Sequence, residues 1–145
     1  MKVSELKETC EKRVGNFKSY ANLSTDEVNN LEKEIDHQFP EDYREFLKAY
    51  GCVESGSEEI LGYGGPKHLD MLEERKILLQ NSLLNFQENL CPISRDGFGN
   101  YDCLRLSNGA ADVVWWVHDG NGCIHKIIAS SFSAWLDEFC EQAMQ

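Results

Sequence analysis

His118, Asp119 and Cys123 flank one predicted hairpin turn and carry the residue types that nucleophilic catalysis uses. A catalytic thiol needs a base within hydrogen-bond reach and surroundings that lower its pKa. Lys126 is the only positive residue near Cys123 in the sequence. We therefore interpret Cys123 as a structural cysteine and His118 as a strand-end residue, and we predict that the chain is not an enzyme. A small hydrolase that uses His118 and Cys123 is the alternative from another class.

Three oxygen-bearing side chains, Asp96, Asn100 and Asp102, share one predicted turn. A calcium loop of the EF-hand type needs six or more oxygen ligands at a spacing that ends in a glutamate, and that spacing is absent here. Asp96 is expected to bond the backbone of its own turn instead. The glycines around Gly62 lack the lysine and hydroxyl residue of phosphate-binding loops. We predict no metal and no cofactor.

The six cysteines are widely spaced and include no C-x-x-C pair. Zinc ribbons and redox motifs need close pairs so that two sulfur atoms reach one centre. Residues 1–10 are charged and polar and lack the apolar core of a secretory signal. We therefore expect free thiols, mostly buried as small apolar residues, in a protein of the cytoplasm.

The charge balance disfavours several classes of partner. Asp and Glu number 25 against 14 Lys and Arg, so the net charge is −11. Such a surface repels the phosphates of nucleic acids and the anionic leaflets of membranes. It attracts a basic protein over a long range. We predict no nucleic-acid ligand and no membrane partner; simple solubility is the other explanation of the charge.

The first half of the chain is predicted to be mainly helical. Helices are expected over residues 4 to about 14, before a turn at Gly15 and Asn16, and from residue 25, where Ser24 and Glu27 have capping-box spacing. Others are expected between Pro40 and a terminal glycine at position 51, and over about 69–80. The last would present Leu69, Leu72, Lys76 and Leu79 on one face. The acidic segment 54–59 is predicted to be a loop, and 60–63 a short strand.

The second half is predicted to form four strands, at 90–94, 101–106, 113–118 and 123–129, followed by a helix capped by Ser130 or Ser131. Short turns join the strands, so neighbouring strands must be antiparallel. The run Val-Val-Trp-Trp-Val at 113–117 indicates burial on both faces. With 145 residues we expect a single domain, 1–145, around one core. The predicted fold class is α+β, an antiparallel β-sheet meander packed against N-terminal helices and a C-terminal helix.

Four segments in order along the chain resemble the SUKH superfamily, which includes fungal cell-wall assembly regulators and bacterial immunity proteins. They are FPEDYREFL at 39–47, residues 93–106 with the turn DGFGN, residues 113–119, and IASSFSAWL at 128–136. The resemblance covers most of residues 24–140, but the segment 54–89 departs from it. It implies that the turn at 96–100 and the strand after it define the fold, and it carries over no catalytic residue.

The resemblance implies an immunity protein that binds and neutralises a cognate toxin, often a nuclease. Together with the acidic charge, it leads us to expect a basic toxin protein as partner, whose cleft the chain would occlude. The alternative is a non-catalytic regulatory scaffold like the fungal relatives. For each acidic residue chosen here, plain solvation is the other explanation. The residues we select for partner binding belong to predicted loops, turns and strand ends: Glu54, Glu58, Glu59, Tyr63, Asp96, Asp102 and Asp119.

Overall fold

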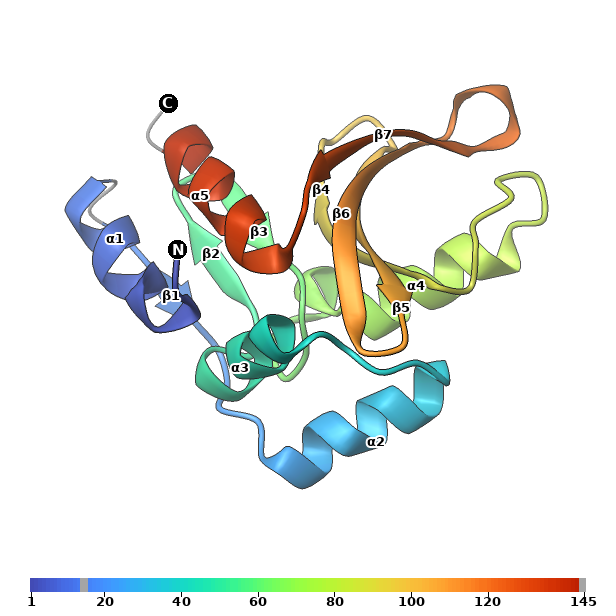
Figure 1. The fold of residues 1–145 in the computed structure, drawn as a ribbon. Helices are drawn as coiled ribbons and strands as arrows, with labels where there is room; N and C mark the ends of the chain where they lie inside the picture. The colour runs from blue at the N-terminus through green and yellow to red at the C-terminus, as the bar shows by residue number, and fades with distance from the viewer. Residues whose placement is uncertain (14–15, 144–145) are drawn as a thin grey trace.

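The computed structural model describes residues 1–13 and 16–143, and its two antiparallel sheets are surrounded by helices (Figure 1). Val14 and Gly15, predicted to end the first helix and open the next turn, lie outside the described residues. The first half contains η1 (Val3–Glu5), α1 (Leu6–Arg13), β1 (Lys18–Ser19), α2 (Thr25–Ile35), α3 (Glu41–Ala49), β2 (Val53–Ser55) and β3 (Glu58–Ile60). The second contains η2 (Lys67–Leu69), α4 (Met71–Gln80), β4 (Leu90–Arg95), β5 (Tyr101–Ser107), β6 (Ala110–Val117), η3 (Asp119–Asn121), β7 (Cys123–Ala129) and α5 (Phe132–Ala143). The predicted α+β class is confirmed.

Local signals begin and end the helices as the sequence predicts. The Ser24 hydroxyl accepts the Glu27 N–H and the Glu27 carboxylate accepts the Ser24 N–H, each at 3.1 Å, which completes the capping box. Gly51 follows α3 with φ of +72°, a conformation that glycine adopts without steric cost. Ser131 caps α5, because its hydroxyl accepts the Ala134 N–H at 3.0 Å.

The larger sheet has the strand order β4-β5-β6-β7, and its strands β5 and β6 bury side chains on both faces. On one face, Leu104 and Val113 pack into the main core with the apolar stripe of α5. On the other, Val114 and Trp116 pack with Leu78 of α4 in a smaller cluster. Figure 1 shows α5 and α4 on opposite sides of this sheet. The predicted burial on both faces is thus confirmed for Val113, Val114 and Trp116, whereas Trp115 and Val117 are only partly buried.

The smaller sheet has the order β1-β2-β3, and it corrects the prediction that residues 54–59 form a loop. Val53 pairs with Ile60 and Ser55 with Glu58, so the acidic segment is a β-hairpin turning at Gly56 and Ser57. Val53 and Ser55 are buried, while Glu54 between them is only partly covered. A three-residue strand is too short to show this alternation clearly in a sequence.

Helix α4 also differs from its predicted face. Arg75 is buried, whereas Lys76 on the predicted face is exposed. The Arg75 guanidinium donates to the backbone carbonyls of Leu90 at 3.3 Å and Glu88 at 2.5 Å. A buried charged group needs such hydrogen bonds to offset its desolvation. Arg75 therefore fixes α4 against the start of β4.

Candidate partner-binding surface

Four of the seven residues selected from the sequence line one pocket of about 500 Å³. Glu58 and Glu59 come from β3, Asp96 from the turn after β4, and Asp102 from β5. The pocket is also lined by Arg95, so its lining carries four carboxylates and one guanidinium. We call this group, together with Ser57, Ser94 and Gly97, the acidic pocket. Its charge favours a cationic side chain of a partner.

A network of ion pairs and close polar contacts borders the acidic pocket. Arg95 lies 3.4 Å from a Glu59 oxygen and 3.5 Å from a Glu74 oxygen. His68 Nε2 lies 3.7 Å from Glu59 and 3.4 Å from Glu54. Through His68, this network links Glu54 to Glu59 of the acidic pocket. Both carboxylates therefore already have polar partners within the chain.

Glu54 has one further partner, the phenol of Tyr20. The Tyr20 hydroxyl donates to Glu54 Oε1 at 2.5 Å. This hydrogen bond is the main reason that the pKa of Tyr20 rises to about 12, because ionisation would break it and set two negative charges together. Glu58, by contrast, makes no hydrogen bond or ion pair through its side chain with another described residue. Within the acidic pocket, Glu58 is therefore the carboxylate most available to a partner.

Asp96 shapes the turn that carries it. Its carboxylate accepts the Phe98 N–H at 2.7 Å, the Asn100 N–H at 3.2 Å and the Asn100 side-chain amide at 2.8 Å. Burial acts to raise the pKa of Asp96, but these hydrogen bonds outweigh it and hold the pKa below its ordinary value. The expectation that Asp96 bonds its own turn is confirmed.

The same turn exposes an aromatic residue that the sequence-based selection missed. The Phe98 side chain is 80% exposed, although Phe is among the residue types most often buried. Phe98 lies between Gly97 and Gly99 and belongs to no periodic pattern of apolar residues. This position in the sequence is the signal that could have indicated an exposed side chain. Phe98 follows four consecutive lining residues of the acidic pocket, 94–97, and adds an apolar contact point beside it.

Asp102 has a structural partner as well as a place in the acidic pocket. Its carboxylate accepts the indole N–H of the buried Trp135 at 2.9 Å, which links β5 to α5. Burial raises the pKa of Asp102, and nearby carboxylates, including Glu138, add to the shift. Ionised Asp102 is therefore less stable in the folded chain than in water.

Replacement of Asp102 tests this arrangement. The folded-state pKa is raised, so ionisation destabilises the fold at neutral pH, and this effect disappears as the pH falls through that pKa. Asp102→Asn keeps an acceptor for Trp135, so its free energy of unfolding at pH 7 should equal or exceed that of the wild type. The difference in the free energy of unfolding between the two proteins should narrow as the pH falls. Asp102→Leu removes the acceptor and should cost about 1–3 kcal/mol. Urea titrations between neutral and acidic pH measure both; equal losses in the two variants would contradict the interpretation.

Tyr63 and Asp119, the remaining selected residues, do not line the acidic pocket. Tyr63 is partly buried against the main core, and its N–H donates to the Gly51 carbonyl at 3.0 Å. Asp119 is exposed in η3, with its carboxylate 3.5 Å from His118 Nε2. Tyr63 is thus partly a packing residue, while Asp119 occupies a separate turn.

His118 connects two turns of the larger sheet. The Asn100 side-chain oxygen accepts the His118 N–H at 3.1 Å and lies 2.8 Å from His118 Nδ1. Nδ1 therefore carries the proton in this arrangement. Among the described residues, no hydrogen bond joins His118 to Cys123, which is exposed. The contacts of His118 are those of a strand-end residue that positions Asn100.

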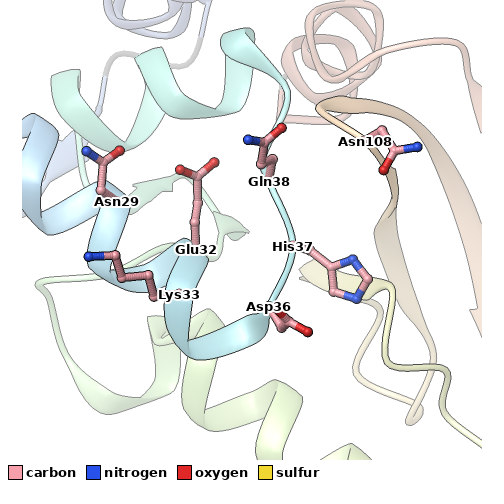
Figure 2. Close-up of a pocket in the computed structure, with 7 residues that line it drawn as sticks. All are labelled: Asn29, Glu32, Lys33, Asp36, His37, Gln38 and Asn108. Atoms are coloured by element: carbon pink, nitrogen blue, oxygen red, sulfur yellow. The ribbon is translucent and has the colours of Figure 1, made fainter.

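A second pocket of about 500 Å³ lies between the C-terminal end of α2 and the β5–β6 turn, and the sequence did not indicate it (Figure 2). Glu32 on its wall accepts the Phe39 N–H at 2.7 Å and pairs with Arg44. Opposite charges line it, and the Glu32 carboxylate is already engaged, so it suits a cationic partner less well than the acidic pocket does. The lining residues are Asn29, Glu32, Lys33, Asp36, His37, Gln38 and Asn108.

Two further structural features bear on ligands. Within residues 1–13 and 16–143, no group of three or more His, Cys, Asp or Glu side chains is placed to hold a metal ion. Over the same part of the chain, every helix is too short or too polar to cross a membrane.

Comparisons with known proteins identify the family. A solved structure, the crystal structure of a protein from Pseudomonas syringae pv. tomato, is similar with a TM-score of 0.67 and 20% identity, covering 91% of this chain and 96% of that one. That likeness shows a shared fold. No curated protein matches the chain. The SUKH_6 family model, described as SMI1-KNR4 cell-wall, matches residues 25–136, which is most of the chain. The chain therefore belongs to the SMI1-KNR4 family of the SUKH superfamily.

Proposed function

We propose that this chain is an immunity protein that binds a basic toxin domain, of the nuclease type, and occludes its nucleic-acid-binding cleft. The observation that carries the proposal is the acidic pocket, whose lining includes Glu58, Glu59, Asp96 and Asp102 against a single arginine, Arg95. The clefts of nucleases carry lysine and arginine to hold phosphates. A surface that presents carboxylates in place of phosphates can occupy such a cleft.

Two kinds of contact would stabilise the complex: charge pairs with the carboxylates and an apolar contact with Phe98. The Glu58 carboxylate has no partner among the described residues, so it can accept a lysine or arginine of the toxin without breaking an internal ion pair. Carboxylates also bind guanidinium groups through two parallel hydrogen bonds. Phe98 beside them offers apolar area that is lost from water only in the complex. The net charge of −11 would speed the encounter.

Co-expression with the toxin domain of a neighbouring reading frame tests the proposal. We expect the chain to restore growth of cells that express the toxin domain, and the purified pair to form a stable complex in which the toxin is inactive. The association rate should fall about tenfold or more as salt rises from about 0.01 M to about 0.5 M. A toxin that stays active in an excess of the chain would refute immunity, whereas a salt-independent rate would refute only electrostatic steering.

A non-catalytic regulatory scaffold is the second candidate, because the description of the matching family model, SMI1-KNR4 cell-wall, refers to the cell wall. In that role the same surface would bind a regulatory or wall-synthesis protein without inhibiting a toxin. Deleting the gene separates the two: altered wall composition in the absence of any toxin supports the scaffold, and sensitivity to a competing toxin-producing cell supports immunity. Both candidates are non-catalytic proteins, for which we propose a cytoplasmic location.

A further inference from the structure

We propose that Cys10 and Cys140 form a modification site, a dithiol that peroxide-class oxidants convert reversibly into a disulfide joining α1 to α5. The two sulfur atoms lie 4.0 Å apart. Their helices lie side by side although they come from opposite ends of the chain (Figure 1). The proposal is independent of the proposed function.

The pairing distinguishes these two thiols from the other cysteines. Cys91 contacts the sulfur of Met71 at 3.0 Å, and Cys103 contacts the carbonyl oxygen of Tyr101 at 4.0 Å. Cys10 and Cys140 are the one pair of cysteines in contact among the described residues. A disulfide bond is about 2 Å long, so the sulfur atoms must approach by about 2 Å, a distance within reach of side-chain rotation and a small helix shift.

Cys10 is suited to react first. The hydrogen bond with the Cys140 thiol is the main cause that lowers the pKa of Cys10 to about 7, with the charge of Arg13 adding to it. The same hydrogen bond and burial raise the pKa of Cys140, which keeps its proton. The thiolate is the nucleophilic form of cysteine, so Cys10 attacks and Cys140 resolves.

The two steps balance with hydrogen peroxide as the oxidant. The Cys10 thiolate attacks one peroxide oxygen, the O–O bond breaks, and the departing hydroxide takes a proton to leave water and a sulfenic acid. Cys140 then attacks the Cys10 sulfur, the S–O bond breaks, and the hydroxide leaves with the Cys140 proton as a second water. Two thiols and one peroxide give one disulfide and two waters.

The disulfide would link positions 10 and 140, which are 130 residues apart. A cross-link that closes so long a loop restricts the unfolded chain strongly. The oxidised chain should therefore melt roughly 5–15 °C above the reduced chain. Both thiols are only 1% exposed, so oxidation should be slower than modification of the exposed Cys123.

The test treats the full chain, as wild type and as Cys123→Ser, with hydrogen peroxide, followed by alkylation and peptide mass spectrometry. Removal of Cys123 prevents disulfides between molecules. We expect a linked pair of peptides containing Cys10 and Cys140, lighter by two hydrogens, and a raised melting temperature that dithiothreitol reverses. Cys10→Ser and Cys140→Ser should each abolish the rise, whereas Cys52→Ser, which removes another buried thiol, should not.

Two results would overturn the proposal. One is the recovery of Cys10 and Cys140 as separate alkylated or sulfinic species after Cys123 in the wild type has been fully oxidised. The other is an equal melting temperature before and after oxidation. The mass measurement is made on the wild-type fold, so it decides the question even if a serine variant fails to fold.

Discussion

Glu58→Lys combined with Glu59→Gln is expected to weaken toxin binding about 100-fold, mainly by slowing association. The change replaces attraction with repulsion at Glu58, whose carboxylate has no hydrogen-bond or ion-pair partner within residues 1–13 and 16–143. Each unfavourable charge contact at an interface costs on the order of 1–2 kcal/mol, and about 1.4 kcal/mol corresponds to tenfold in affinity. The amide introduced at position 59 can still accept a hydrogen bond from Arg95, so the fold should persist. Stopped-flow association with the toxin domain measures the effect.

The matched control is Glu34→Lys combined with Glu45→Gln. These exposed residues of α2 and α3 change the net charge by the same amount but lie outside the acidic pocket. The control should slow association only slightly. A second comparison uses Phe98→Ala, which removes the apolar anchor and should raise the dissociation rate about tenfold with little effect on association. If the control and the double variant bind equally weakly, the acidic pocket is not the contact site.

Gly62→Ala is expected to lower the free energy of unfolding by about 2–4 kcal/mol. A Cβ atom at position 62 would lie 1.7 Å from the Gly51 carbonyl oxygen, so one of two backbone segments must move. Gly62 also donates its N–H to the Leu69 carbonyl at 2.9 Å and accepts the Met71 N–H at 2.8 Å. The substitution therefore disturbs the place where the segment after β3 contacts the end of α3 and the start of α4.

Gly97→Ala separates steric contact from backbone conformation. Gly97 has φ of +84°, but a Cβ there would have no neighbour within 4 Å in the part of the chain that the structure describes. This variant carries only the conformational cost of a left-handed residue, about 1–2 kcal/mol. Urea unfolding of both variants gives the comparison. A Gly62→Ala protein as stable as wild type would show that the two segments do not approach as closely as described.

Several features of this chain depend only on residues close together in the sequence, so the sequence alone is enough to predict them. Ser24 and Glu27 predict the start of α2 because a capping box involves only one turn of chain. The strands β4 to β7 are predictable because glycine-rich turns of a few residues leave them no arrangement except an antiparallel one. The net charge, and with it the expectation of a basic partner, is a sum over residues and needs no fold.

Which acidic residues share a site depends instead on how distant parts of the chain pack together. Glu58 belongs to the smaller sheet, whereas Asp96 lies in the turn after β4 of the larger sheet, so their meeting depends on how β3 packs against β4. The hairpin that carries Glu58 was predicted to be a loop, because three-residue strands show too little alternation. Asp102 likewise bonds Trp135, and Arg75 bonds backbone carbonyls near β4. In both cases the partner is distant in the sequence. Local patterns set each element, whereas contacts between distant residues follow from packing the whole chain at once.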